Sequence, residues 1–167
     1  VTGRSEGSEG IESKSTITID GGEVVVNAYD DGINAASGIT VNGGRLFARA
    51  SNNDGIDSNG WLVIYGGTVI ASACANSADA GIDSDMGIHI NGGTVIATGN
   101  MLDEIAESEQ NYVVFNFLES VSGGSAITIK NDAGEIVSEY APDNNYTCLV
   151  VSAKDLIEGT YTIWKDN

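Results

Sequence analysis

The sequence contains few proline, cysteine and histidine residues and few basic side chains. Its 167 residues include one proline, two cysteines and one histidine, and seven Lys and Arg residues stand against 24 Asp and Glu. The formal net charge of −17 disfavours nucleic acid and anionic membranes as partners, because both would be repelled. No apolar run is long enough to span a bilayer, so we expect no membrane insertion. Divalent cations are the natural partners of such an acidic surface.

The few cysteine and histidine residues form no familiar catalytic or metal-binding pattern. Cys74 and Cys148 lack the spacing of a zinc site or a redox pair, so they form one disulfide or remain free thiols. His89 stands at an outward position between two isoleucines of a predicted strand, and we find no Ser-His-Asp set that it could complete.

The chain is instead rich in one repeated motif, a Gly-Ile pair beside acidic residues. Its copies read EGIES at 9–13, DGINA at 31–35, NDGIDS at 53–58 and DAGIDS at 79–84. Their glycines lie 22, 23 and 26 residues apart, and four Gly-Gly pairs advance by the same intervals. A fixed period whose length varies in one loop per repeat indicates a solenoid.

Apolar residues alternate with period two on both sides of each Gly-Gly pair, which predicts two strands per repeat. Ile11, Ile33, Ile56 and Ile82 supply a third inward row. The Gly-Gly pairs suit sharp corners, because glycine reaches positive φ without a Cβ clash. We therefore predict an all-β fold, a right-handed parallel β-helix of about four coils over residues 1–99.

The repeat stops after residue 99, and the C-terminal third has a different pattern. We predict a connecting loop or short helix over 100–111 and a non-repeating β segment over 112–167. Five alternating runs predict its strands, at 112–117, 126–130, 135–140, 147–153 and 160–164, with a hairpin connection at 131–134. Because a solenoid exposes strand edges at its ends, we expect this segment to cap or flank the coils.

One row of apolar residues is predicted to point outward from the coils. It consists of Val25, Phe47, Ile70 and Ile96, at the same position of the strand after each Gly-Gly pair. Such a row is unfavourable in water, so we expect the C-terminal strands to pack on it. The competing hypothesis is a surface for a ligand or partner.

Stacked coils would align the acidic turns in columns about 4.8 Å apart. One predicted column contains Glu12, Asn34, Asp57 and Asp83, and a second contains Glu9, Asp31, Asp54 and Ala80. Neighbouring carboxylates repel unless protons or cations lie between them, and hard oxygen ligands suit calcium. The alternative is that these residues are solvated and serve only the turn conformation.

Three stretches carry a resemblance to a known family: EGIESKSTITIDGGEVVVNAYDDGINAASGITVNGG, NDGIDSNGWLVIYGGTVIA and NYTCLVVSAKDLIEGTYTI. They resemble the bacterial secreted carbohydrate-binding-domain family of calcium-binding parallel β-helix proteins. The resemblance implies a pectate-lyase-like architecture and an extracellular or bacterial cell-surface location. It also implies that the protein binds plant cell-wall polysaccharides, such as polygalacturonate and cellulose, and does not catalyse a reaction on them. It implies Ca²⁺ ligands at Asp30, Asp31, Asn34, Asp54, Asp57, Asp79 and Asp83. The sequence departs from the acidic pattern at Asn34 and Ala80.

Two other functions stay open, a structural cell-surface or adhesin solenoid and a calcium-dependent polysaccharide lyase. A lyase needs a basic residue beside its metal, whereas Arg45 and Arg49 belong to a strand after a Gly-Gly pair. We expect Arg45 to pair with Glu23 and Arg49 to be an ordinary surface residue. Aromatic side chains at Trp61, Tyr65 and Tyr29 are equally suited to corner packing and to stacking on sugars.

Overall fold

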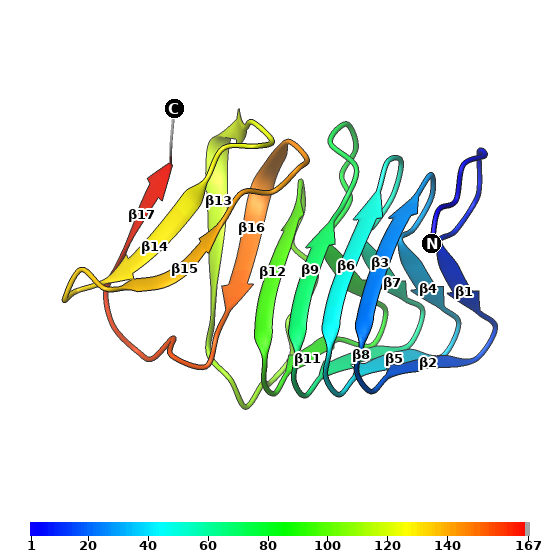
Figure 1. Cartoon of the computed structure of the whole chain (residues 1–167), viewed down its shortest axis with the longest axis horizontal. Helices are drawn as coiled ribbons and strands as arrows, with labels where there is room; N and C mark the ends of the chain where they lie inside the picture. The colour runs from blue at the N-terminus through cyan, green and yellow to red at the C-terminus, as the bar shows by residue number, and fades with distance from the viewer. Residues whose placement is uncertain (166–167) are drawn as a thin grey trace.

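The computed structural model describes residues 1–165, which form a β-solenoid of about four turns of stacked parallel strands (Figure 1). The predicted fold class is confirmed. These residues contain no helix, and therefore none that is long and apolar enough to cross a membrane.

Each coil contributes one strand to each of three parallel sheets. The strands that follow the acidic turns are β1 (Ile11–Ser13), β4 (Ile33–Ala35), β7 (Ile56–Ser58) and β10 (Ile82–Ser84). The second sheet contains β2 (Thr16–Ile19), β5 (Gly38–Val41), β8 (Trp61–Ile64) and β11 (Ile88–Ile90). The strands after the Gly-Gly corners are β3 (Glu23–Ala28), β6 (Arg45–Ala50), β9 (Thr68–Ser72) and β12 (Thr94–Gly99).

The core is built from the inward rows that the alternation predicts. Equivalent residues pair directly from coil to coil, as in the register Ile33 to Ile56 and Ile56 to Ile82. Ile33, Ile56, Leu62 and Ile88 are completely buried. Stacks of matching branched side chains give each coil apolar neighbours above and below, and this burial is the main stabilising contribution.

The second glycine of each Gly-Gly pair makes the corner. Gly22, Gly44, Gly67 and Gly93 have φ values of 80°, 87°, 84° and 84°. A Cβ on Gly44 would lie 2.6 Å from the carbonyl oxygen of Gly22 in the preceding coil. Both the positive φ and the close approach of stacked corners therefore require glycine there.

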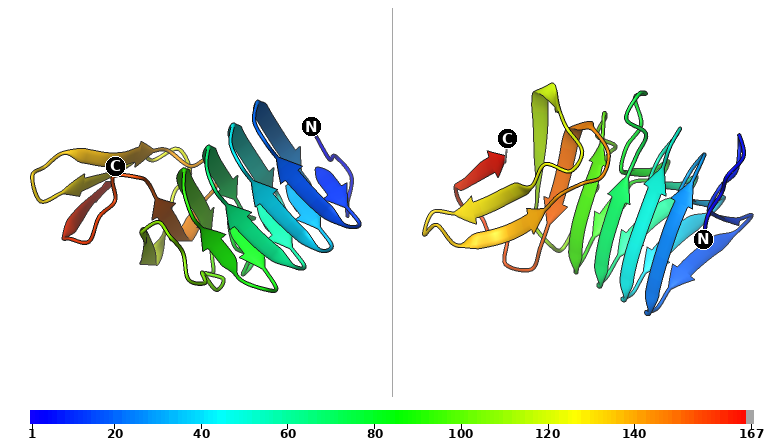
Figure 2. Two further views of the ribbon diagram at one scale, coloured as in Figure 1. Left: turned by 90° about the horizontal axis from the view of Figure 1, so that it is seen from below. Right: turned by 45° about the horizontal axis from the view of Figure 1, so that its top comes forward.

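The C-terminal strands close one end of the solenoid. They are β13 (Tyr112–Val121), β14 (Ile127–Asn131), β15 (Ile136–Tyr140), β16 (Tyr146–Ser152) and β17 (Tyr161–Lys165). Strand β16 pairs antiparallel with β12 and with β13, which extends the third sheet to six strands. Strands β15, β14 and β17 form a separate antiparallel sheet at the end of the molecule away from the N-terminus (Figure 2).

All five predicted strands of this segment are present, and so is the hairpin turn at 131–134 between β14 and β15. The last two residues of the segment predicted over 112–167 lie outside the described residues.

The segment 100–111 is a loop, so the alternative of a short helix is wrong. It follows the otherwise unpaired edge of β11, where Ile105 forms a bridge with Ile88 and the Ser108 hydroxyl accepts a hydrogen bond from the Ile90 amide. That strand edge supplies the backbone hydrogen bonds that a helix would have formed internally. Cys74 and Cys148 are buried free thiols.

The outward apolar row is covered at one end and open at the other. Ile96 and Ile70 are 6% and 8% exposed because they pack against Leu149, Ile127 and neighbouring side chains of the C-terminal segment. Val25, in the first coil, is 47% exposed. The prediction that this segment covers the row is therefore right for the last two coils and wrong for the first.

Candidate functional site

The acidic turns align in the two predicted columns. In the outer column Glu12 lies in register with Asn34, Asn34 with Asp57, and Asp57 with Asp83. The inner column contains Glu9, Asp31, Asp54 and Ala80. Its turns also stack in register, because the Gly10 amide donates a hydrogen bond to the Asp31 carbonyl and the Gly32 amide donates one to the Asp54 carbonyl.

Inner-column carboxylates bind the backbone of the next coil. The Asp31 Oδ1 atom accepts a hydrogen bond of 3.0 Å from the Asp54 amide, and Asp54 Oδ1 accepts one of 2.6 Å from the Ala80 amide. No further copy of this turn follows Ala80 in sequence. A side chain at position 80 therefore has no equivalent amide from which to accept a hydrogen bond, which explains why alanine is tolerated there.

Burial makes the inner column electrostatically costly. Desolvation raises the pKa of Asp31 to about 8 and that of Asp54 to about 7, and the charges of neighbouring carboxylates add to both increases. Desolvation also raises the pKa of Glu9, whose buried Oε2 atom has no hydrogen-bond partner among the described residues. Each carboxylate here favours a proton or a cation beside it.

The outer column is partly neutralised by hydrogen bonds. The Asn34 amide donates to Asp57 Oδ2 over 2.6 Å, which opposes the increase in the Asp57 pKa caused by desolvation. Desolvation and the neighbouring Asp103 raise the pKa of Asp83 to about 7. Asp103 also accepts a hydrogen bond from the Ser84 amide. Sequence reasoning missed Asp103, because it comes from the loop after the last repeat.

The remaining predicted calcium ligands, Asp30 and Asp79, precede the inner column by one residue and are half-buried. Asp79 accepts a hydrogen bond from the Ser77 hydroxyl. Within residues 1–165, no three His, Cys, Asp or Glu side chains converge closely enough to hold a metal ion. The turns thus bring the predicted ligands together in pairs and columns, and a cation would also need carbonyl, amide or water oxygens.

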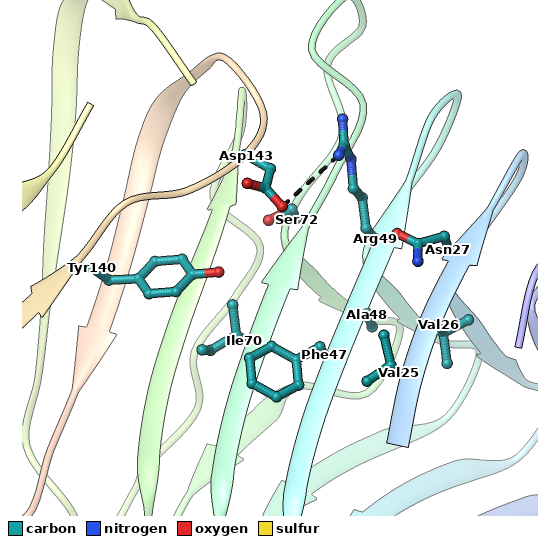
Figure 3. Close-up of a pocket in the computed structure, with 10 residues that line it drawn as sticks. All are labelled: Val25, Val26, Asn27, Phe47, Ala48, Arg49, Ile70, Ser72, Tyr140 and Asp143. Atoms are coloured by element: carbon teal, nitrogen blue, oxygen red, sulfur yellow. Dashed lines mark ion pairs between the residues drawn. The ribbon is translucent and has the colours of Figure 1, made fainter. Parts of the chain in front are cut away.

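A second site lies on another face, where the outward apolar row is open. It is a groove of about 350 Å³ over β3, β6 and β9, bounded on one side by the end of β15 and the residues that follow it (Figure 3). Its floor contains Val25, Phe47 and Ile70, which are in register on adjacent strands.

Polar side chains form the upper part of the groove. Asn27, Arg49 and Ser72 follow the floor residues by two positions and are also in register. Tyr140 and Asp143 face them from the C-terminal segment (Figure 3). A concave site with an apolar floor and a few hydrogen-bonding groups is typical of small-molecule binding sites.

Two arginines flank the phenylalanine of the floor. Arg49 Nη1 lies 3.9 Å from Asp143 Oδ2, with both side chains largely exposed, so this ion pair is weak. The guanidinium carbon of Arg45 lies 5.5 Å from the centroid of the Phe47 ring. The described residues contain no ion pair between Arg45 and Glu23, so that prediction is wrong. The Arg45 guanidinium lies over the Phe47 ring instead.

Tyr140 keeps its hydroxyl proton in this setting. Burial, with a smaller effect from the negative charge of Asp143, raises the pKa of Tyr140 above its ordinary value. The hydroxyl is therefore a hydrogen-bond donor at neutral pH. Sequence reasoning missed Tyr140 and Asp143, because only the packing of the C-terminal segment brings them to coil two.

The three aromatic residues considered from the sequence lie elsewhere. The Trp61 ring packs on Gly38, where an added Cβ would come within 2.3 Å of it, so Trp61 fills a corner although it is 40% exposed. Tyr65 is 58% exposed and Tyr29 is half-buried. None of the three lines the groove.

Fold and groove together define a β-solenoid with one open, partly apolar face. Comparison with known families places the chain more closely: it belongs to the family of carbohydrate-binding domain-containing proteins, which matches residues 1–145. That span includes all the coils and every residue that lines the groove. No curated protein and no solved structure matches the chain.

Proposed function

We propose that this protein is an extracellular or cell-surface, non-catalytic binder of plant cell-wall or acidic polysaccharide, and that the groove on β3, β6 and β9 is its binding face. Family membership supports a carbohydrate ligand and a binding role. The observation that carries the location is a groove whose apolar floor is open at Val25 and lies beside a row of polar side chains. Sugar rings present apolar C–H faces and hydroxyl edges, and such a groove matches both.

Calcium at the acidic turns is the second part of the proposal. The oxygen atoms of Asp31, Asp54, Asp57 and Asp83, with Asn34, are the donors that Ca²⁺ prefers, and no basic side chain of the described residues pairs with them. Their raised pKa values favour a proton or cation at each turn. When bound, Ca²⁺ would neutralise the columns and stabilise the stack of coils. Asp30 and Asp79 lie close enough in sequence to add ligands.

A lyase function receives less support. Arg45 and Arg49 lie on β6 in the third sheet, whereas Asp57 and Asp83 lie on β7 and β10 in the first. Lys14 pairs with Glu12 at the first-coil end of the outer column, and no ion pair of the described residues joins an arginine or lysine to Asp57 or Asp83. The base of a calcium-assisted elimination therefore has no evident candidate beside those two carboxylates. A purely structural solenoid remains the alternative to a binder, and it predicts no glycan affinity.

The test is affinity electrophoresis in gels that contain polygalacturonate, a soluble cellulose derivative or dextran, with and without a chelator. We expect retardation by a plant cell-wall polysaccharide and none by dextran. Calcium is tested separately by calorimetry on chelated protein, with Asp57→Asn plus Asp83→Asn as the variant. Folded protein that binds no polysaccharide would favour the structural solenoid.

A further inference from the structure

Two arginines lie in or beside the groove of a protein that is otherwise strongly acidic. The chain has three arginines, at positions 4, 45 and 49, and two of them lie on the outward face of β6. With a rise of about 3.3 Å per residue, their Cα atoms are about 13 Å apart, with Phe47 midway between them. The chain as a whole would repel an anionic glycan, so this strand is where one can approach.

The donors of both guanidiniums are available to a ligand. Among the side-chain hydrogen bonds of residues 1–165, none involves Arg45 or Arg49. The distance of 3.9 Å between Arg49 and Asp143 is longer than a hydrogen bond. Asp143 belongs to the connection between β15 and β16, and its side chain is 74% exposed. It is therefore an internal anion that a better-placed carboxylate can displace.

The arginine fork fits a sugar carboxylate. A guanidinium donates two parallel hydrogen bonds to a carboxylate, which an alcohol or an ester cannot accept with the same strength. The Phe47 ring can stack on the apolar face of a sugar beside that carboxylate when the Arg45 guanidinium, which lies over the ring, turns to the ligand. Tyr140 and Asn27 face the same space and can bind hydroxyl groups.

We propose that the groove selects uronate-containing glycans directly through Arg49, which exchanges Asp143 for a sugar carboxylate, with Phe47 beneath the sugar ring and Arg45 beyond it. This recognition needs no calcium and is separate from the acidic turns. The inference rests on the proposed function, because it names the residue that sets the ligand preference of the same groove.

Calorimetry in the presence of a chelator tests this inference, with a short oligogalacturonate and its fully methyl-esterified, uncharged form as probes. Arg49→Gln should weaken binding of the acid about 10-fold or more, the usual effect of losing hydrogen bonds to a charged group. Asp143→Asn should strengthen it about 2-fold, because the competing anion is removed. The ester should bind more weakly and equally well to wild type and Arg49→Gln.

Lys154→Gln is the matched control, since it removes one positive charge from an exposed site outside the groove. Equal affinities of Arg49→Gln and Lys154→Gln for the acid would overturn the inference, and so would an ester that binds as well as the acid. Binding that requires calcium and is lost in Asp57→Asn plus Asp83→Asn would move recognition to the acidic turns, which overturns the inference but leaves the proposed function standing. Folded wild-type protein that binds no polysaccharide, with or without the chelator, would reject both this inference and the proposed function.

Discussion

The two halves of the outward apolar row have the same sequence pattern and different surroundings. In coils three and four, Ile70 and Ile96 belong to a closed cluster with Leu149 and Ile127. In coils one and two, Val25 and the partly buried Phe47 form the open part of a groove floor, and Ile70 is its covered edge. A solenoid repeats its surface at every coil, so a single non-repeating segment decides which part of that surface is core and which part is free to bind.

The acidic columns show the same contrast between their ends. Asp54, in the third coil, uses its carboxylate to accept the Ala80 amide. Glu9, in the first coil, has a buried oxygen atom that no described residue contacts by a hydrogen bond. Within the inner column, the carboxylate nearer the C-terminal segment therefore has a backbone donor in the next coil, and an oxygen atom of the first-coil carboxylate has none among the described residues.

The largest expected effect concerns the covered half of the row. Ile96→Ala should lower the free energy of unfolding by about 3 kcal/mol, because it leaves a cavity under the C-terminal strands. Val25→Ala, at the exposed end of the same row, should change it by less than about 0.5 kcal/mol. Urea unfolding of both variants measures the difference. Equal losses would show that the two halves of the row are packed alike.

A second prediction separates the ends of the inner acidic column. Asp54→Ala should destabilise the protein by about 1–3 kcal/mol, since it leaves the buried Ala80 amide without an acceptor. Asp54→Asn keeps an acceptor oxygen and should cost less. Glu9→Gln, which removes a partly buried charge and keeps an acceptor oxygen for the Asp31 backbone, should be neutral or stabilising. Thermal unfolding in the presence of a chelator ranks the three variants by stability. A Glu9→Gln variant as unstable as Asp54→Ala would show that the two ends of the inner column do not differ.

The pH dependence of calcium-free protein follows from the raised pKa values of Asp31 and Asp54. Their folded-state values of about 8 and 7 exceed the ordinary value of 3.8, so the folded state holds more protons than the unfolded state between these limits. This stabilising contribution is fully present below pH 3.8 and is lost as the pH rises through 7 to 8.

We therefore expect chelated protein to lose about 1 kcal/mol or more of unfolding free energy between pH 5 and pH 8. Saturating calcium should flatten this profile if the ion binds at the turns. Stability that rises with pH in the chelated protein would show that these carboxylates are charged and stabilised in some other way.

The smallest expected effect concerns the open half of the row. Phe47→Leu keeps an apolar side chain but removes the ring, so it should weaken glycan binding by about 0.5–1.5 kcal/mol while the melting temperature stays nearly constant. Ile96→Val, in the covered part of the same row and outside the groove lining, is the control and should leave affinity unchanged. Loss of affinity in the control alone would place the ligand closer to the C-terminal segment.

The coils could be predicted from the sequence because each structural requirement recurs four times. The Gly-Gly corners need positive φ, the inward isoleucines need matching neighbours, and the acidic turns keep their register; each appears in every repeat with its spacing. The prediction for Arg45 failed because the sequence indicates its neighbour Glu23 but not the competing attraction of the Phe47 ring.

The groove could not be predicted, because it depends on contacts between residues far apart in sequence. Strand β16 pairs with β12 although β13, β14 and β15 lie between them in sequence, and that pairing brings Asp143 to Arg49. The alternation predicts the C-terminal strands themselves but contains no information on which coil they cover. Asp103 escaped prediction for a related reason, since it joins the acidic column from outside the repeat.

Hydrogen exchange with and without a saturating oligogalacturonate is the most direct test of the claim that the uncovered part of the row is the binding face. We expect slower exchange in residues 45–49 and 140–145 and no change in the acidic turns at 53–58 and 79–84. Protection confined to those turns, with β6 unaffected, would contradict the account and place the glycan on the acidic columns.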